Sequence, residues 1–160
     1  METSIKKVKI NEKVVVLTYD TNEIVNDELV TMNYQLKSTI KPHPDFFTAL
    51  QSLKRHFINL LEFDIFKDNK KTSERHTIHT LSIYEDMDDT RIIMSGNKYI
   101  KSGKCFNVNS PLISLDNEDY EGLTELNADV EIIISEAKEY INGKNGEVQY
   151  KIEFEKKEND

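Results

Sequence analysis

Histidine and cysteine are the residue types best suited to metal binding or nucleophilic chemistry, and in this chain they are few and widely spaced. His76 and His79 are three residues apart in a segment with strand character, where residues at that spacing point to opposite faces. His43 and His56 are far apart in sequence, and Cys105 has no histidine or second cysteine beside it. A zinc site needs three or four converging ligands, and a catalytic thiol needs a basic partner. The sequence therefore predicts no metal site and no catalytic cysteine.

Short motifs for calcium, phosphate or acyl chemistry are also incomplete. The runs 86–89 and 116–119 are acidic, but they lack the central glycine and terminal glutamate of a calcium-binding loop. Ser102, Gly103 and Lys104 look like part of a phosphate loop, but the upstream glycine and the following helix are missing. No Gly-x-Ser-x-Gly motif is present. We therefore expect a protein that is not an enzyme and has no cofactor. The alternative is a small enzyme whose site forms only in three dimensions.

The strongest pattern in the sequence is an excess of acidic residues between Asp116 and Asn142. This segment holds nine acids and one base, Lys138, and its balance of −8 equals the formal charge of the whole chain. The remaining residues balance, with twenty acids (29 − 9) and twenty bases (21 − 1). Charge confined to one segment suggests a partner of opposite sign.

On a helix with 100° per residue, the acidic segment separates into an apolar face and an acidic face. Ile132 lies within the acidic face, and an apolar residue among carboxylates is typical of a binding surface. The alternative is a solvated face that only aids solubility. The residues predicted to bind a partner are Glu118, Glu121, Glu125, Asp129, Ile132, Glu136 and Glu139.

Apolar periodicity predicts an α+β fold, in which two amphipathic helices pack on a mainly antiparallel β-sheet. The helices are expected at about 44–61, after a proline-rich entry, and at about 117–142, before Gly143. Alternation of apolar and polar residues is clearest in Glu28–Ile40. One globular domain would span 1–154, followed by a solvated charged tail at 155–160. Further strands are expected at 4–10, 12–19, 76–84, 90–95, 97–101, 104–108 and 148–154, with a polar turn at 20–27.

The single cysteine and the hydropathy pattern indicate the compartment. One cysteine excludes an intramolecular disulfide, which favours a reducing, cytoplasmic environment. No apolar run approaches the roughly 20 residues of a membrane-spanning helix. We therefore expect a cytoplasmic protein with no membrane partner.

Basic residues offer an alternative binding surface on the strands and loops, where they could contact the phosphates of a nucleic acid or a nucleotide, as in an accessory protein that binds either. Nearby acids dilute each group, and the negative net charge opposes nonspecific binding to nucleic acid. Lysines that protect strand edges from aggregation are the simpler interpretation. The three groups are Lys6, Lys7, Lys9 and Lys13; Lys67, Lys70, Lys71 and Arg75; and Lys98, Lys101 and Lys104.

The charge asymmetry of Asp116–Asn142 and the helix entry Pro42-His43-Pro44-Asp45-Phe46-Phe47 together resemble small acidic accessory proteins of phages and mobile elements. Within that group the chain is similar in style to CRISPR inhibitors, several of which present acidic surfaces to nucleic-acid-binding clefts. The resemblance implies an inhibitor or modulator of a bacterial nucleic-acid-processing complex, with a basic protein or ribonucleoprotein as its partner. It assigns no functional role to an individual residue.

Overall fold

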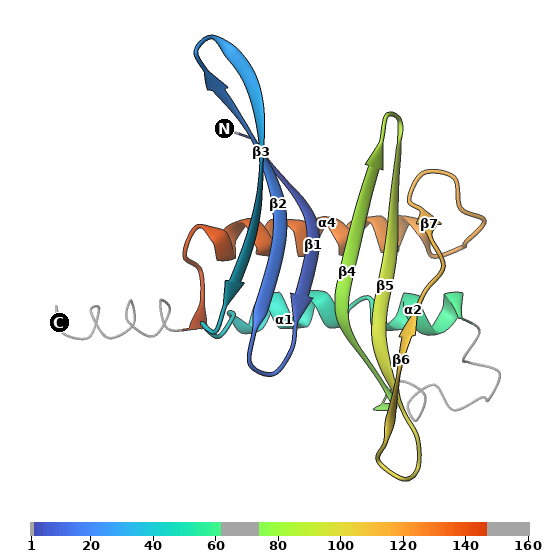
Figure 1. The fold of residues 1–160 in the computed structure, drawn as a ribbon. Coiled ribbons are helices and arrows are strands. Elements are labelled where there is room, and N and C mark those ends of the chain that lie inside the picture. Colours follow the sequence, from blue (N-terminus) through green and yellow to red (C-terminus); the bar gives the residue numbers. More distant parts are fainter. Residues whose placement is uncertain (1, 62–73, 147–160) are drawn as a thin grey trace, which may run out of the picture.

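A seven-stranded antiparallel sheet forms one layer of the protein (Figure 1). The structure is a computed structural model, and it describes residues 2–61 and 74–146. Six strands follow the order β3-β2-β1-β4-β5-β6, and β7 pairs with β5. Two helical segments, α1–α2 and α4, lie on the same face of this sheet and form the second layer. The α+β fold predicted from the sequence is therefore confirmed. The strands are β1 (Glu2–Ile10), β2 (Val15–Val25), β3 (Glu28–Ser38), β4 (His76–Asp86), β5 (Asp89–Tyr99), β6 (Cys105–Asn109) and β7 (Ile113–Ser114).

The first helical segment contains two short helices, α1 (Pro44–Gln51) and α2 (Lys54–Leu60), where the sequence predicted one helix over 44–61. His43 caps α1, because its Nδ1 accepts a hydrogen bond from the Asp45 N–H. The break falls at Ser52, whose hydroxyl donates to the Ala49 carbonyl oxygen and competes with the helical backbone pattern.

The acidic helix, α4 (Leu123–Ile141), is shorter than the predicted 117–142. Residues 115–117 and 121–122 form turns before it, and Gly122 occupies the N-cap position. Gly143 follows the helix with a φ of 102°, the left-handed conformation expected of a terminating glycine.

The turn between β2 and β3 is tighter than the sequence suggested. Residues 20–25 continue β2, and the predicted polar turn at 20–27 is therefore wrong. The reversal needs only Asn26 and Asp27, with φ values of 53° and 64°, which is the geometry of a two-residue hairpin turn. The predicted strand at 97–101 belongs largely to β5, while the strand predicted at 148–154 lies outside the described residues.

The hydrophobic core lies between the helices and one face of the sheet. Every second residue of the central strands points into it, including Leu17, Leu81 and Met94, which are fully buried. The helices contribute fully buried side chains that include Phe46, Leu50, Phe57, Leu126 and Ile133. No helix within residues 2–61 and 74–146 is long and apolar enough to cross a membrane.

Gly96 in β5 lies where β5 approaches β4 closely. A Cβ at this position would overlap the Thr77 backbone carbonyl oxygen on β4, which cannot move without disturbing the sheet. We expect Gly96→Ala to lower the free energy of unfolding by about 1–3 kcal/mol, measured by urea denaturation. Gly146→Ala is the matched control, because its nearest neighbour, the Pro42 carbonyl oxygen, is 3.7 Å away. Equal stability of the two variants would contradict this description of the β4–β5 contact.

Candidate functional site

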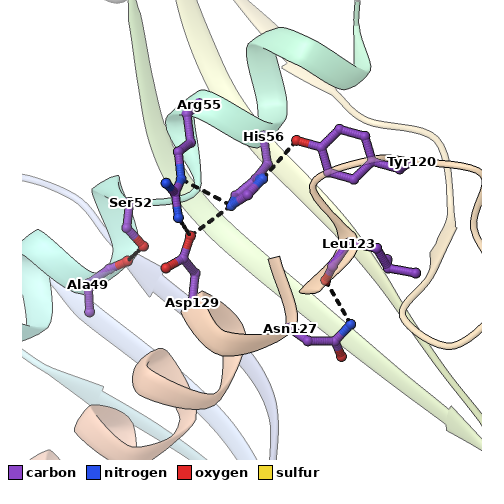
Figure 2. Close-up of polar contacts among 8 residues, drawn as sticks. All are labelled: Ala49, Ser52, Arg55, His56, Tyr120, Leu123, Asn127 and Asp129. Carbon is purple, nitrogen blue, oxygen red and sulfur yellow. Dashed lines mark hydrogen bonds and ion pairs between the residues drawn. The ribbon is translucent and has the colours of Figure 1, made fainter. Parts of the chain in front are cut away.

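A cluster of four polar side chains connects α2 to α4 and the turn before α4 (Figure 2). The Asp129 carboxylate oxygen Oδ2 lies 2.7 Å from His56 Nε2 and 2.8 Å from Arg55 Nη2. His56 Nδ1 lies 2.8 Å from the Tyr120 hydroxyl. His56 is 2% exposed and Asp129 is 9% exposed. The contact between these two side chains therefore lies at the boundary of the core.

The buried position of His56 favours its neutral form. Burial lowers the pKa of His56, and this effect exceeds the opposing effect of the hydrogen bond to Asp129. In the neutral form we assign Nε2–H as the donor to Asp129 at 2.7 Å, which is shorter than the competing 3.3 Å contact from Arg55 Nε, and Nδ1 then accepts the proton of the Tyr120 hydroxyl. The hydrogen bond to Asp129 raises the pKa of Arg55, so the guanidinium supplies the positive charge of the cluster.

Asp129 is the predicted partner-binding residue that the structure places differently. The helical projection assigned it to the exposed acidic face, but its side chain turns toward α2 and is buried there. The cause is tertiary: Arg55 and His56 provide a charge and a hydrogen-bond donor at the position where Asp129 meets the neighbouring helix.

Other predicted residues are also engaged within the protein. Lys144 lies 3.2 Å from a Glu136 carboxylate oxygen and 2.9 Å from a Glu139 oxygen, and it also approaches Asp45 at 3.6 Å. Hydrogen bonds to Glu139 and Glu136 raise the pKa of Lys144. Glu118 accepts a hydrogen bond from the Ser114 N–H. These carboxylates therefore have partners near both ends of α4.

The remaining predicted residues, Glu121, Glu125 and Ile132, are exposed. Glu121 and Glu125 form no hydrogen bond or ion pair with any other residue of the described ranges, and the same holds for Asp119. We call Asp119, Glu121 and Glu125 the rim carboxylates. They line an open cavity of about 620 Å³, together with Arg55, His56 and Tyr120.

The polar cluster and the rim carboxylates differ in what they can do. Inside the cluster, each of the four side chains is hydrogen-bonded to another member, as in a structural connection between two elements. The rim carboxylates keep their charge available at the cavity. No group of three or more histidine, cysteine, aspartate or glutamate side chains in residues 2–61 and 74–146 is arranged to hold a metal ion. The rim carboxylates give the cavity an acidic lining, which can attract a cationic group.

Sequence reasoning missed Arg55, His56 and Tyr120 as members of a site. A signal was present, because His56 adjoins Phe57 on the buried side of α2, and Asp129 adjoins Val130 on the buried side of α4. A histidine and an aspartate bordering two apolar stripes suggest a buried pair, provided that the two helices are known to be neighbours.

Comparison with protein-family models, with curated proteins and with solved structures found no match to this chain.

The neutral state of His56 predicts a dependence of stability on pH. Its pKa in the folded protein is below the ordinary value of 6.5, so the unfolded chain binds more protons as the pH falls through this interval. This contribution to stability is complete above about pH 6.5 and is lost as the pH falls toward the folded-state pKa. We expect the difference in unfolding free energy between wild type and His56→Gln to be larger at pH 7.5 than at pH 5.

Urea denaturation of both proteins across this pH range measures the effect. At pH 7.5 the variant should lose about 1–3 kcal/mol, because hydrogen bonds of the buried cluster are disrupted. His79→Gln is the control, since His79 lies outside the cluster and bonds Thr80 and Asn107. A pH-independent difference for His56→Gln would show that His56 does not titrate differently in the two states.

Proposed function

We propose that this protein is a non-enzymatic binding protein that inhibits or modulates a bacterial nucleic-acid-processing complex, such as a CRISPR effector. The contact surface consists of the rim carboxylates and Ile132. The observation that carries the proposal is that Glu121 and Glu125 are exposed beside a cavity and form no hydrogen bond or ion pair within the described residues, whereas Asp129, Glu136 and Glu139 are engaged within the protein.

The cavity favours a cationic group from the partner. Three carboxylates line it, while Arg55, the one cation among the described residues that line it, already binds Asp129. A lysine or arginine side chain entering the cavity would meet these carboxylates and the ring of Tyr120, with which a cation interacts favourably. Burial of such a pair away from bulk water reduces screening and strengthens the attraction.

Ile132 provides an apolar contact on the same helix. It is 53% exposed, and it lies about two helical turns after Glu125. Binding surfaces commonly combine an apolar centre with a charged rim. The cation in the cavity and an apolar contact at Ile132 would together fix the orientation of the partner.

A partner that handles nucleic acid fits this surface because it carries clefts rich in lysine and arginine for phosphate binding. An acidic protein that occupies such a cleft competes with the nucleic acid for the same cations. The competition would weaken with salt, because electrostatic steering is screened.

A second candidate function, direct binding of nucleic acid, is favoured by one observation. Pairing of the strands places Lys9 of β1, Val16 of β2 and Lys37 of β3 in one row, on the sheet face that the described helices do not cover. Lys7 points to the same face two residues away. This basic surface carries fewer charges than the acidic one, and the negative net charge of the chain would repel a nucleic acid.

Charge reversal tests the proposed contact surface. We expect Glu121→Lys/Glu125→Lys to weaken binding to a purified CRISPR effector ribonucleoprotein, or to another partner captured from bacterial lysate, by at least tenfold, or about 1.4 kcal/mol. Calorimetry at low and moderate salt would measure the affinity. Charge reversal at Asp129 would not test the contact surface alone, because it would also break the buried cluster.

The matched control is Glu12→Lys/Asp88→Lys, which makes the same change in net charge at two exposed sites outside the helical layer. It should bind with nearly wild-type affinity. Equal affinity for the two double variants would eliminate the rim carboxylates as the contact. Capture of nucleic acid alone, lost on Lys9→Glu/Lys37→Glu, would favour the second candidate instead.

A further inference from the structure

Among the described residues, β3 is an edge strand with no strand paired to its outer side. It pairs with β2 over all eleven of its residues, and no other strand in residues 2–61 and 74–146 lies beyond it. Alternate N–H and C=O groups of an edge strand point away from the sheet. β3 therefore offers a template on which a further strand can pair.

Features that normally protect an edge strand are weak in β3. It contains no proline, and its pairing with β2 has no register shift. Its one basic residue, Lys37, lies close to the end of the strand. The opposite edge, β6, is only five residues long. A long, regular edge without a bulge or a central charge is suited to strand addition.

The side chains of β3 are complementary to a second antiparallel copy of β3. Complete overlap of the eleven residues centres the pairing on Asn33. In this register Val30 lies opposite Leu36, and Met32 lies opposite Tyr34. These four side chains are on the sheet face that packs against the helices, so two copies would continue one apolar surface.

Charge also permits self-association at this edge, although the chain carries a net charge of −8. β3 has one acid, Glu28, and one base, Lys37, and is therefore neutral. Complete overlap places Glu28 opposite Ser38 and Lys37 opposite Leu29, so like charges do not face each other.

Exposed apolar residues gather on the hairpin that contains β3. Ile24 on β2 and Leu29 on β3 form a cross-strand pair, with exposed fractions of 76% and 73%. Tyr34, in the middle of β3, is 39% exposed. In the overlapped register the aliphatic part of the second copy's Lys37 would cover Leu29.

We propose that two copies of this chain associate through antiparallel pairing of their β3 strands, which joins two sheets into one continuous sheet. The interface is isologous, since each copy contributes the same strand. This surface is separate from α4, so dimerisation does not depend on the partner proposed for the helical face.

Sedimentation equilibrium of the full-length chain tests the proposal. We expect a dimer for the wild type and a monomer for Thr31→Lys/Gln35→Lys, with unchanged circular dichroism. Both residues are exposed, and in the overlapped register they face each other across the interface, which would bring four positive charges together. Cys105→Lys/Asn109→Lys adds the same charge to β6 and should remain dimeric.

A wild-type monomer at all concentrations would overturn the proposal. Hydrogen exchange then separates the other occupants: protected outer amides of β3 in a monomer would assign the edge to another segment of the same chain. Rapid exchange of these amides in a monomer would instead make a strand from a different protein the candidate that pairs with this edge. A dimer that survives the β3 substitutions but not those on β6 would also overturn it.

Cross-linking gives an independent measurement if the charged variant fails to fold. Asn33→Cys, in a Cys105→Ser background, should form a disulfide-linked dimer under mild oxidation, because the two copies of position 33 are directly opposite. Lys37→Cys in the same background should not, since complete overlap separates its two copies by eight residues, or about 27 Å. Cross-linking of the second variant but not the first would contradict the register.

Discussion

The packing of two helical segments side by side on one face of an antiparallel sheet is the constraint on which the other features depend. Only one sheet face has a helical cover in the described part of the chain, so the apolar residues of the strands and the helices must meet in a single layer. That requirement brings α2 against α4. The boundary between these helices is where Asp129 meets Arg55 and His56, and the cavity opens beside it.

Acidic residues that look equivalent in the sequence acquire different roles from this packing. Asp129 contributes to the connection between helices, and Glu136 with Glu139 holds Lys144. Glu121 and Glu125 retain accessible charge. A surface that seems uniformly acidic is therefore divided into a region that stabilises the fold and a region that can attract a partner. Net charge alone would overestimate the area available for recognition.

Local patterns in the sequence were sufficient for the class of fold. Alternation in Glu28–Ile40 marks β3, and Gly143 marks the end of α4, because both depend on short-range geometry. The break at Ser52 was not predicted, because a hydroxyl that bonds a nearby carbonyl leaves the apolar stripe unchanged. The strand 20–25 was missed because its polar residues resemble a turn.

The candidate site was less accessible to sequence reasoning than the fold. Its members come from positions 55–56 and 120–129, and only tertiary packing brings them together. Helical projection found the exposed positions of Glu125 and Ile132, since these depend on α4 alone, and Glu121 is also exposed although it lies in the turn before α4. It could not show that Asp129 is buried, because that outcome depends on the residues of another helix.

The position of Cys105 gives this protein a convenient point of attachment. It is the chain's one cysteine, it is exposed, and it begins β6 at the sheet edge opposite β3. Its pairing with Tyr99 directs it to the sheet face that the described helices leave uncovered. A fluorophore or a solid support linked to this thiol would therefore leave α4 and the outer edge of β3 accessible to solution.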